Sequence, residues 1–531
     1  MRDVHENETP VLIVGAGPTG LLLGAELRRR GVECRVIDEH EGPMHWDRAT
    51  VIHPRSLEAF EAVGLSDQFL EAGVKQRKAV VHSQGRRLGE IDLAICGSRH
   101  GFNLGLSEET TESILDEYLA RQGGRVERSS RLTALELHDD RVVATIERDG
   151  TEERASFQWL IGCDGYHSVC RQEAAIELEG DDIDAPWAVF DAMLDPWSES
   201  YEANYAFLDE LPVILTALPD RRWRVYLRPS ADESDLVEDA AVTIGRYHPG
   251  TAIEDVANPT RFYCHTKVAT RFRSGRVLLA GDAAHVCSPA EGHGMNSGIQ
   301  DAFNLAWKLA LVVRGVCAPD LLESYEVERR PVAEAITRSG AMAEQAQSQT
   351  SPAARHARDA TLAAAYADPG SRHHEAVAEA ELDIDYGRSV LALGDANAVL
   401  GPGQRLPTTI GAVSTEGRDR FLDQTLGHTG HTALVVGGAA AAAGELAHLA
   451  SSVREAADPA LVERTVTASI AGTGTGAGDG AVRLDAAACE LLGVDEVTLF
   501  VLRPDGHVGL RADRDHLEAL RRYQSLLRGA A

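Results

Sequence analysis

Apolar runs and amphipathic stretches alternate along the first part of the chain, a pattern typical of parallel strands covered by helices. The apolar run Val11–Val14 predicts a fully buried strand, and it leads directly into Gly15, Gly17 and Gly20. Residues 21–30 follow with the spacing of a helix, and residues 33–37 predict a second strand that ends at Asp38 and Glu39. This order of strand, glycine turn, helix and strand predicts an α/β domain.

The glycines have the G-x-G-x-x-G spacing of a dinucleotide-binding turn. Gly15 permits the tight turn, Gly17 lets the backbone approach a pyrophosphate, and Gly20 lets the helix pack closely on the sheet. An acid at the end of the second strand is placed to accept hydrogen bonds from an adenosine ribose, and it disfavours a 2′-phosphate. The turn predicts nucleotide binding, but by itself it does not separate FAD from NAD.

Two later segments favour FAD over a plain NAD dehydrogenase. The sequence CDGYHSVCR, at 163–171, follows the apolar run 159–161. The run 276–279 leads into Gly281 and Asp282, and the glycine-rich turn at 291–294 is expected to open a helix near Asn296. An acid at a strand end could hold a ribityl hydroxyl, and the N–H groups of a helix N-terminus could face the flavin pyrimidine edge.

The remaining pattern predicts the domain organisation. Four strand-like runs, at 188–194, 204–208, 212–219 and 221–229, predict a separate sheet that could cover the flavin and contact substrate. An apolar helix is expected at 302–313 and a long amphipathic helix at 321–347. The expected units are an FAD-binding domain at 1–180 and 265–345, a middle sheet domain at 181–264, a helical linker at 346–395 and a C-terminal domain at 396–531.

Composition narrows the class further. The 531 residues include 52 Lys and Arg against 82 Asp and Glu, a formal net charge of −30 that opposes nonspecific binding to nucleic acid or an anionic membrane. We find no apolar run of membrane-spanning length and no secretory signal, so a cytoplasmic protein is expected. The eight cysteines form no C-x-x-C pair and no Cys/His cluster with zinc-ligand spacing, so no metal site is predicted.

Together these segments resemble the class A flavoprotein monooxygenases, the aromatic hydroxylases related to para-hydroxybenzoate and phenol hydroxylase. Residues 47–73 and the sequence VLRPDGHVGLRAD at 501–513 are most similar to the hydroxylases of actinomycete polyketide biosynthesis. The resemblance implies a Rossmann-like FAD-binding domain of the para-hydroxybenzoate hydroxylase type with an inserted β-sheet substrate domain. It also implies a thioredoxin-like C-terminal domain, here without C-x-x-C, that is structural and could form a homodimer surface.

The resemblance also implies which residues hold the cofactor. The matching positions are Gly15, Gly17, Pro18, Gly20, Asp38, Glu39, Arg48, Glu108, Asp164, Gly281, Asp282, Pro289, Gly292, Gly294, Met295 and Asn296. Two positions depart from the family pattern. Glu291-Gly292-His293-Gly294-Met295-Asn296 stands where the family usually has G-G-Q-G-x-N, and Glu108 stands where a glutamine is common. An extra carboxylate near a pyrophosphate would repel it, so Glu108 is expected to face away or toward the ribose.

By the same resemblance, NADPH or NADH reduces FAD, O2 adds to form the flavin C4a-hydroperoxide, and one oxygen atom passes to a phenolic or polycyclic aromatic substrate. Baeyer–Villiger insertion, epoxidation and modification of an antibiotic remain alternatives, because substrate pose decides among them. A flavin reductase or a non-catalytic flavoprotein is a further alternative.

No catalytic side chain is fixed by the sequence. Arg48 and His293 are candidates, with a pyrophosphate ion pair as the alternative for Arg48, and His53 and His285 lie in the same two segments. A structural contact is favoured for His285. The substrate candidates are Tyr205, Trp223 and Tyr226 on the middle sheet, although packing within that sheet is the favoured role for each.

Overall fold

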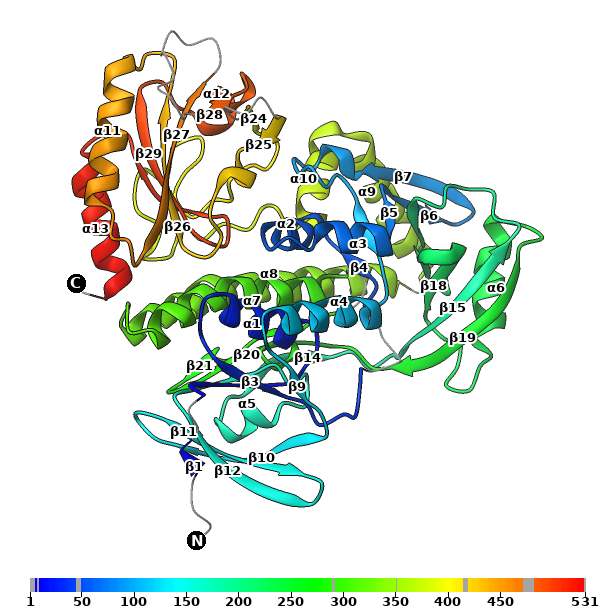
Figure 1. Ribbon diagram of the computed structural model, residues 1–531. Helices are drawn as coiled ribbons and strands as arrows, with labels where there is room; N and C mark the ends of the chain where they lie inside the picture. Colours follow the sequence, from blue (N-terminus) through cyan, green and yellow to red (C-terminus); the bar gives the residue numbers. More distant parts are fainter. Residues whose placement is uncertain are drawn as a thin grey trace.

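The computed structural model describes residues 5–6, 9–43, 49–288, 292–349, 351–413, 419–470 and 482–529. Three sheets dominate it, and a layer of long helices lies between the first sheet and the C-terminal one (Figure 1). No helix in the described ranges has both the length and the apolar character that crossing a membrane requires.

The nucleotide-type sheet has the strand order β21-β22-β13-β2-β3-β9. Its bounds are β2 Val11–Val14, β3 Cys34–Ile37, β9 Val126–Glu127, β13 Trp159–Gly162, β21 Arg273–Ser274 and β22 Val277–Leu279. All neighbours pair in parallel except β21 with β22. The fully buried apolar strands expected for a parallel sheet with both faces covered are therefore present.

Helices cover this sheet and carry the glycine turns at their N-termini. Helix α1 (Pro18–Arg29) begins three residues before the predicted helix, because Pro18 fits the first helical turn. It packs against α4 (Glu108–Arg121) and α7 (His293–Val313). Helix α7 joins the expected turn and the apolar helix into one element, and α8 (Glu323–Gln347) follows it.

The middle sheet has the order β19-β15-β18-β17-β16-β6-β7. The bounds are β6 Lys78–Ser83, β7 Arg86–Asp92, β15 Trp187–Asp195, β16 Ala203–Phe207, β17 Val213–Ala217, β18 Arg222–Leu227 and β19 Ala252–Phe262. Helix α6 (Leu236–Tyr247) covers one face. Strands β6 and β7 correct the expected boundary at residue 181, because β6 pairs in parallel with β16 instead of joining the nucleotide-type sheet.

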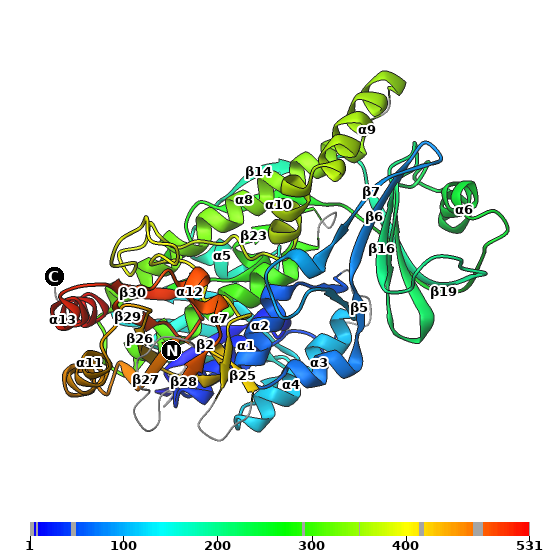
Figure 2. The same ribbon diagram turned by 90° about the horizontal axis from the view of Figure 1, so that it is seen from above.

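The expected linker is helical and packs on the middle sheet. Helices α9 (Pro352–Ala367) and α10 (Pro369–Glu379) both contact β7, and Figure 2 shows α9 running beside β6 and β7. The Tyr366 side chain lies against Gly89, where a Cβ atom would approach it to 2.3 Å. The linker therefore fixes the edge of the middle sheet.

The C-terminal sheet has the order β25-β24-β28-β27-β26-β29-β30. Its bounds are β24 Gly411–Val413, β25 Asp419–Phe421, β26 His431–Gly437, β27 Val462–Ile470, β28 Val482–Leu484, β29 Val497–Leu502 and β30 Val508–Ala512. Strands β26, β27 and β28 are parallel, whereas β29 and β30 form an antiparallel hairpin. Helices α11 (Ala443–Ala456) and α13 (His516–Arg528) lie on the same side of this sheet, and α12 (Ala487–Leu492) follows β28 (Figure 1).

Three small sheets complete the fold. The first has the order β1-β12-β11-β10, the second β14-β20-β23 and the third β4-β8-β5. The strands are β1 His5–Glu6, β4 Val51–Ile52, β5 Val74–Gln76, β8 Asn103–Gly105, β10 Ser130–Leu137, β11 Val142–Arg148, β12 Thr151–Phe157, β14 Leu178–Asp182, β20 His265–Ala269 and β23 His285–Val286. The remaining helices used below are α2 (Pro54–Ala62), α3 (Ser66–Ala72) and α5 (Val169–Glu173).

Candidate functional site: a cavity between the glycine turns and the middle sheet

The first glycine turn is shaped by close backbone contacts. Gly15 has φ +101°, and a Cβ atom there would lie 2.2 Å from the Cys163 carbonyl oxygen. A Cβ at Gly20 would lie 2.0 Å from the Gly15 oxygen, whereas at Gly17 the nearest atom would be 3.8 Å away. Gly17 is also the N-cap of α1 and supplies no side-chain cap. The turn thus leaves room for a phosphate group and directs helix N–H groups toward it.

The acids after β3 lie beside this turn. The Asp38 carboxylate accepts hydrogen bonds from the backbone N–H groups of Ala16 (2.7 Å) and His40 (2.9 Å). Asp38, Glu39 and Arg128 line a cavity of about 250 Å³ that Gly15 and Gly17 also border. Asp38 therefore braces the glycine turn, and Glu39 offers the second carboxylate at this cavity.

Asp164 braces a helix start in the middle segment. Its carboxylate accepts hydrogen bonds from the Ser168 hydroxyl (2.6 Å) and from the Cys170 N–H (3.0 Å), at the first turn of α5. Burial raises the pKa of the Cys163 and Cys170 thiols well above their usual range, with nearby acid charge adding to the effect. Both thiols are therefore protonated near neutral pH and are unsuited to nucleophilic chemistry.

The second glycine segment lies across from the first. Gly281 has φ +61°, and its N–H donates to Asp301 Oδ2 at 3.0 Å. The next residue, Asp282, is exposed to the cavity. Gly292 has φ +71° and is the N-cap of α7, and Gly294 and Met295 line the same cavity.

Asn296 has a different position from these neighbours. Its side chain is fully buried, accepts from the His53 N–H (2.9 Å) and donates to the carbonyl oxygens of Val51 (2.8 Å) and Gly292 (2.9 Å). These hydrogen bonds of the Asn296 amide connect the turn before α7 to β4 and are all made within the protein. Arg48 and Pro289 lie outside the described residues, so their predicted roles stay predictions.

A cavity of about 1120 Å³ connects these turns to the middle sheet. On the nucleotide side it is bordered by Gly17, Pro18, Glu39, Glu108, Asp164 and Asp282. The Glu108 carboxylate lies 3.5 Å from the Ala49 N–H. Across the cavity, Val81, Asn204, Ala206, Ile214, Thr216 and Tyr226 line the sheet side.

Strand alternation decides which substrate candidates reach the cavity. Along β18, Trp223, Val225 and Leu227 point into the core under α6, whereas Tyr226 points to the opposite face. The Tyr226 hydroxyl lies 3.2 Å from the Thr50 hydroxyl at the cavity wall. Trp223 is 1 % exposed and packs in the core under α6, a position that agrees with the packing role favoured for it.

Tyr205 belongs mainly to the core. It borders the cavity but is 1 % exposed, its ring packs near Trp197 and Trp223, and its hydroxyl donates to the Ser200 carbonyl oxygen at 2.8 Å. The neighbouring Asn204 lies on the cavity face, where Gln76 accepts a hydrogen bond from its amide at 2.9 Å. Asn204, Ile214 and Thr216 were missed, although alternation from Trp223 and Tyr205 would have found them.

The histidine candidates do not line the cavity in the described part of the chain. His285 Nε2 lies 2.7 Å from Asp301 Oδ2, and both side chains are buried. Burial favours a raised pKa for Asp301, but the His285 and Arg329 charges outweigh it and hold that pKa below its usual range. His285 is therefore a structural contact, whereas His293 and His53 meet Glu381, a residue that sequence reasoning missed.

The geometry defines an α/β protein with a dinucleotide-type glycine turn and a large cavity that extends from this turn to the middle sheet. A family model described as "FAD binding domain" matches residues 8–340, so the chain belongs to that family. The residues fit FAD: the glycine turn leaves space at Gly17, the α1 N-terminus faces it, and the cavity continues to Asp282 and the α7 turn. FAD is thus the cofactor of this fold.

Relatives and solved structures agree with this class. The chain is 39 % identical over 330 residues to 6-methylpretetramide 4-monooxygenase of Streptomyces rimosus, a match that covers 61 % of this chain and 59 % of that relative. A flavin-dependent monooxygenase, PieE, solved with FAD and substrate, has a TM-score of 0.79 at 24 % identity and covers 98 % of this chain and 99 % of that one. OxyS anhydrotetracycline hydroxylase of Streptomyces rimosus has a TM-score of 0.75 at 25 % identity, over 98 % and 99 % of the two chains.

These likenesses confirm the predicted α/β class and the para-hydroxybenzoate hydroxylase type of fold. The match to the Streptomyces rimosus relative spans about three fifths of that protein's own length.

Proposed function

We propose that this protein is an FAD-dependent monooxygenase that uses NADPH or NADH and O2 to hydroxylate a phenolic, multi-ring aromatic substrate. The observation that carries the proposal is the cavity of about 1120 Å³ that joins Gly17 and Asp282 to Tyr226 on the middle sheet. Sites for one small molecule span roughly 300–1,000 Å³. The larger volume favours two ligands side by side, a flavin and an aromatic substrate. The name of the Streptomyces rimosus relative supports the substrate class.

The chain's own residues would hold the cofactor at several points. Gly17 and the α1 N-terminus would bind the pyrophosphate, Glu39 and Asp38 the adenosine side, Asp282 the ribityl side, and Gly294 with Met295 would border the ring. Bound FAD would supply the redox chemistry, accepting a hydride from the nicotinamide and activating O2 for transfer to the aromatic ring.

The middle sheet would position the substrate and exclude water. Val81, Ala206 and Ile214 present apolar groups to the cavity, and a water-poor site favours oxygen transfer over wasteful loss of the oxidant. Tyr226 and Thr50 place two hydroxyl groups together on this wall, where they could hydrogen-bond a substrate hydroxyl and fix the ring's orientation. Tyr226 is one of the three predicted substrate candidates, and Thr50 adds to it.

The mixed order of the C-terminal sheet, with its terminal hairpin and α13, supports a thioredoxin-like domain. A cytoplasmic location and a homodimer through this domain stay predictions.

The test is anaerobic reduction of the purified flavoprotein by NADPH and by NADH, with and without a panel of phenolic polycyclic compounds, followed by O2 and product mass. We expect one panel compound to accelerate loss of the flavin's visible absorbance and to gain one oxygen atom. If reduction is fast with every compound but no product gains oxygen, the reductase alternative replaces the proposal.

A further inference from the structure

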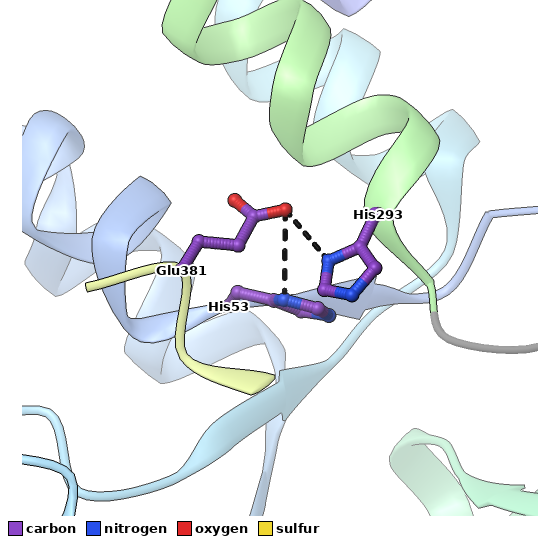
Figure 3. A group of neighbouring side chains, drawn as sticks. All are labelled: His53, His293 and Glu381. Atoms are coloured by element: carbon purple, nitrogen blue, oxygen red, sulfur yellow. Dashed lines mark hydrogen bonds and ion pairs between the residues drawn. The ribbon is translucent and has the colours of Figure 1, made fainter. Parts of the chain in front are cut away.

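A cluster of two histidines and one glutamate lies beside the turn that opens α7. His53 is the N-cap of α2, His293 is the first residue of α7, and Glu381 follows α10, so three separate segments contribute (Figure 3). The Nδ1 atom of His293 lies 2.8 Å from Glu381 Oε1, and the Nδ1 atom of His53 lies 3.8 Å from the same oxygen. The two imidazole rings meet edge to face, with their centroids 4.9 Å apart.

His53 is the unusual member of the cluster. It is fully buried, and neither of its ring nitrogens makes a hydrogen bond of good geometry within the described residues, although the Glu379 backbone lies close enough to interact with the ring. A buried polar group without a hydrogen bond costs free energy, so a ligand such as a bound ion is one explanation for its presence. An imidazole nitrogen that carries no proton has a lone pair that can bind a cation.

Glu381 supplies a carboxylate that is already oriented. Its side chain is 2 % exposed, and its second oxygen, Oε2, accepts a hydrogen bond from the Gln300 side chain on α7. Its backbone has φ +57°, an unfavourable conformation for a residue with a side chain. Oriented ligand carboxylates and a locally strained backbone are both common at built sites.

We propose that His53, His293 and Glu381 form a binding site for one Zn²⁺ ion that ties the N-terminus of α7 to α2 and to the segment after α10. One ring nitrogen from each histidine and one carboxylate oxygen lie within 4.8 Å of one another. Donors about 2.0–2.2 Å from a tetrahedral Zn²⁺ are roughly 3.3–3.5 Å apart. The separations of 2.8 and 3.8 Å between Glu381 Oε1 and the two Nδ1 atoms lie on either side of this value, so ion binding requires small shifts of the carboxylate and of the imidazole rings.

The donor set selects the metal. Two imidazoles and one carboxylate suit Zn²⁺, whereas Mg²⁺ and Ca²⁺ prefer oxygen ligands alone. A plain ion pair between His293 and Glu381 explains the 2.8 Å distance, but it leaves both nitrogens of the buried His53 side chain without a hydrogen bond of good geometry. Gly294 and Met295, one and two residues after His293, line the large cavity. The ion would therefore hold the turn at the start of α7 from the side away from the cavity, because none of its three ligands lines the cavity.

The test uses the intact flavoprotein and metal content as its readout. The protein is dialysed against a chelator, loaded with Co²⁺, and titrated with Zn²⁺ while the visible spectrum and the metal-to-protein ratio are recorded. We expect one Co²⁺ per chain with the absorption bands of a low-symmetry, nitrogen-bound ion, displaced by an equal amount of Zn²⁺. Failure of the wild-type protein to retain either ion after dialysis overturns the proposal, and so does preferential uptake of Mg²⁺.

Two variants locate the ion. His53→Phe removes the nitrogens, and Glu381→Gln removes the charge at constant size; each should weaken Zn²⁺ binding at least about tenfold. His448→Gln, at an exposed position on α11, is the matched control and should bind as the wild type does. Retained FAD and an unchanged far-UV circular dichroism spectrum show that a variant is folded. Equal Zn²⁺ affinity in a folded His53→Phe variant overturns the assignment.

Discussion

Gly15 and Gly17 lie two residues apart in one turn, yet different physical constraints act on them. Gly15 combines a positive φ with a backbone oxygen 2.2 Å from the position of a Cβ, whereas Gly17 has open space on the cavity side. The fold therefore requires glycine at position 15, whereas glycine at position 17 leaves space for a phosphate group.

The close backbone contact at Gly15 makes a side chain there costly. Gly15→Ala should lower the free energy of unfolding by well over about 1 kcal/mol and abolish retention of FAD, because the methyl group collides with the Cys163 carbonyl. Gly31→Ala is the matched control: φ is +75°, but no atom lies within 4 Å, so only about 1 kcal/mol of backbone strain is expected. Urea denaturation and bound-flavin absorbance measure both. Equal losses in the two variants would show that φ alone matters.

Two tyrosines on the middle sheet have different surroundings: the Tyr226 hydroxyl lies at the cavity wall, whereas Tyr205 packs mainly in the core. Tyr226→Phe removes the hydroxyl beside Thr50 and should raise the KM for substrate up to about tenfold, the effect of one hydrogen bond, with little change in stability. Tyr205→Phe removes a hydroxyl bonded to the Ser200 carbonyl and should lower stability by about 1 kcal/mol at unchanged KM. Steady-state kinetics with thermal unfolding distinguishes them, and the reverse pattern would place the substrate elsewhere.

At the scale of elements, the β29–β30 hairpin is fastened to the helices that carry the flavin-side turns. Arg503 donates to both carboxylate oxygens of Glu328 on α8, at 2.9 and 2.7 Å, and Lys308 on α7 donates to Glu328 at 2.7 Å. Asp505 accepts from the Trp307 indole at 3.0 Å. All these charged side chains are buried. An unpaired charge would be too costly to bury, so the contact between the hairpin and the helices depends on this pairing.

Removing one partner should therefore be costly. Arg503→Met should destabilise the protein by about 3–5 kcal/mol, because Glu328 keeps one buried cation where it had two. Arg87→Met, which breaks the exposed pair with Glu90, should change stability by less than about 1 kcal/mol. Chemical denaturation followed by both flavin release and circular dichroism checks this. A small effect of Arg503→Met would mean that the hairpin is not fastened by this pair.

At the scale of the whole molecule, buried histidines link stability to pH. His431 lies against Trp307 of α7 and Tyr523 of α13, and His507 lies in the β29–β30 hairpin against Tyr386. Burial lowers the pKa of each to about 4. An unfolded histidine titrates near about 6.5. Between these values the unfolded chain binds protons that the folded chain does not, so stability falls as pH drops through this window.

The denaturant midpoint should therefore decrease from pH 7 to pH 4.5. His431→Phe should reduce this slope, because it removes one of the buried groups while filling the site, whereas His448→Gln on the surface should leave it unchanged. Below about pH 4.5 a second loss is expected, because burial is outweighed by the Arg503 and Lys308 charges, which hold the pKa of Glu328 at about 2. A midpoint constant from pH 7 to 4.5 would contradict the histidine assignment.

The sequence by itself determined the fold class and the cofactor side of the site. Gly15, Gly17, Gly20 and the strands around them are contiguous, so local spacing was enough to predict the turn and the α1 N-terminus. It could also predict the strands of the middle sheet, because alternation and turn residues are local signals.

Tertiary structure alone decided which faces and segments meet. Trp223 and Tyr226 have equal aromatic character, and only the packing of α6 on one face of the sheet sends one to the core and the other to the cavity. Strand β6 pairs with β16, so Lys78 lies opposite Ala203, 125 positions further along the chain. His53, His293 and Glu381 come together from three distant segments, so no short sequence motif predicts the cluster. The physical reason is that periodicity encodes an element and its buried face, whereas the partner of that face depends on the whole chain.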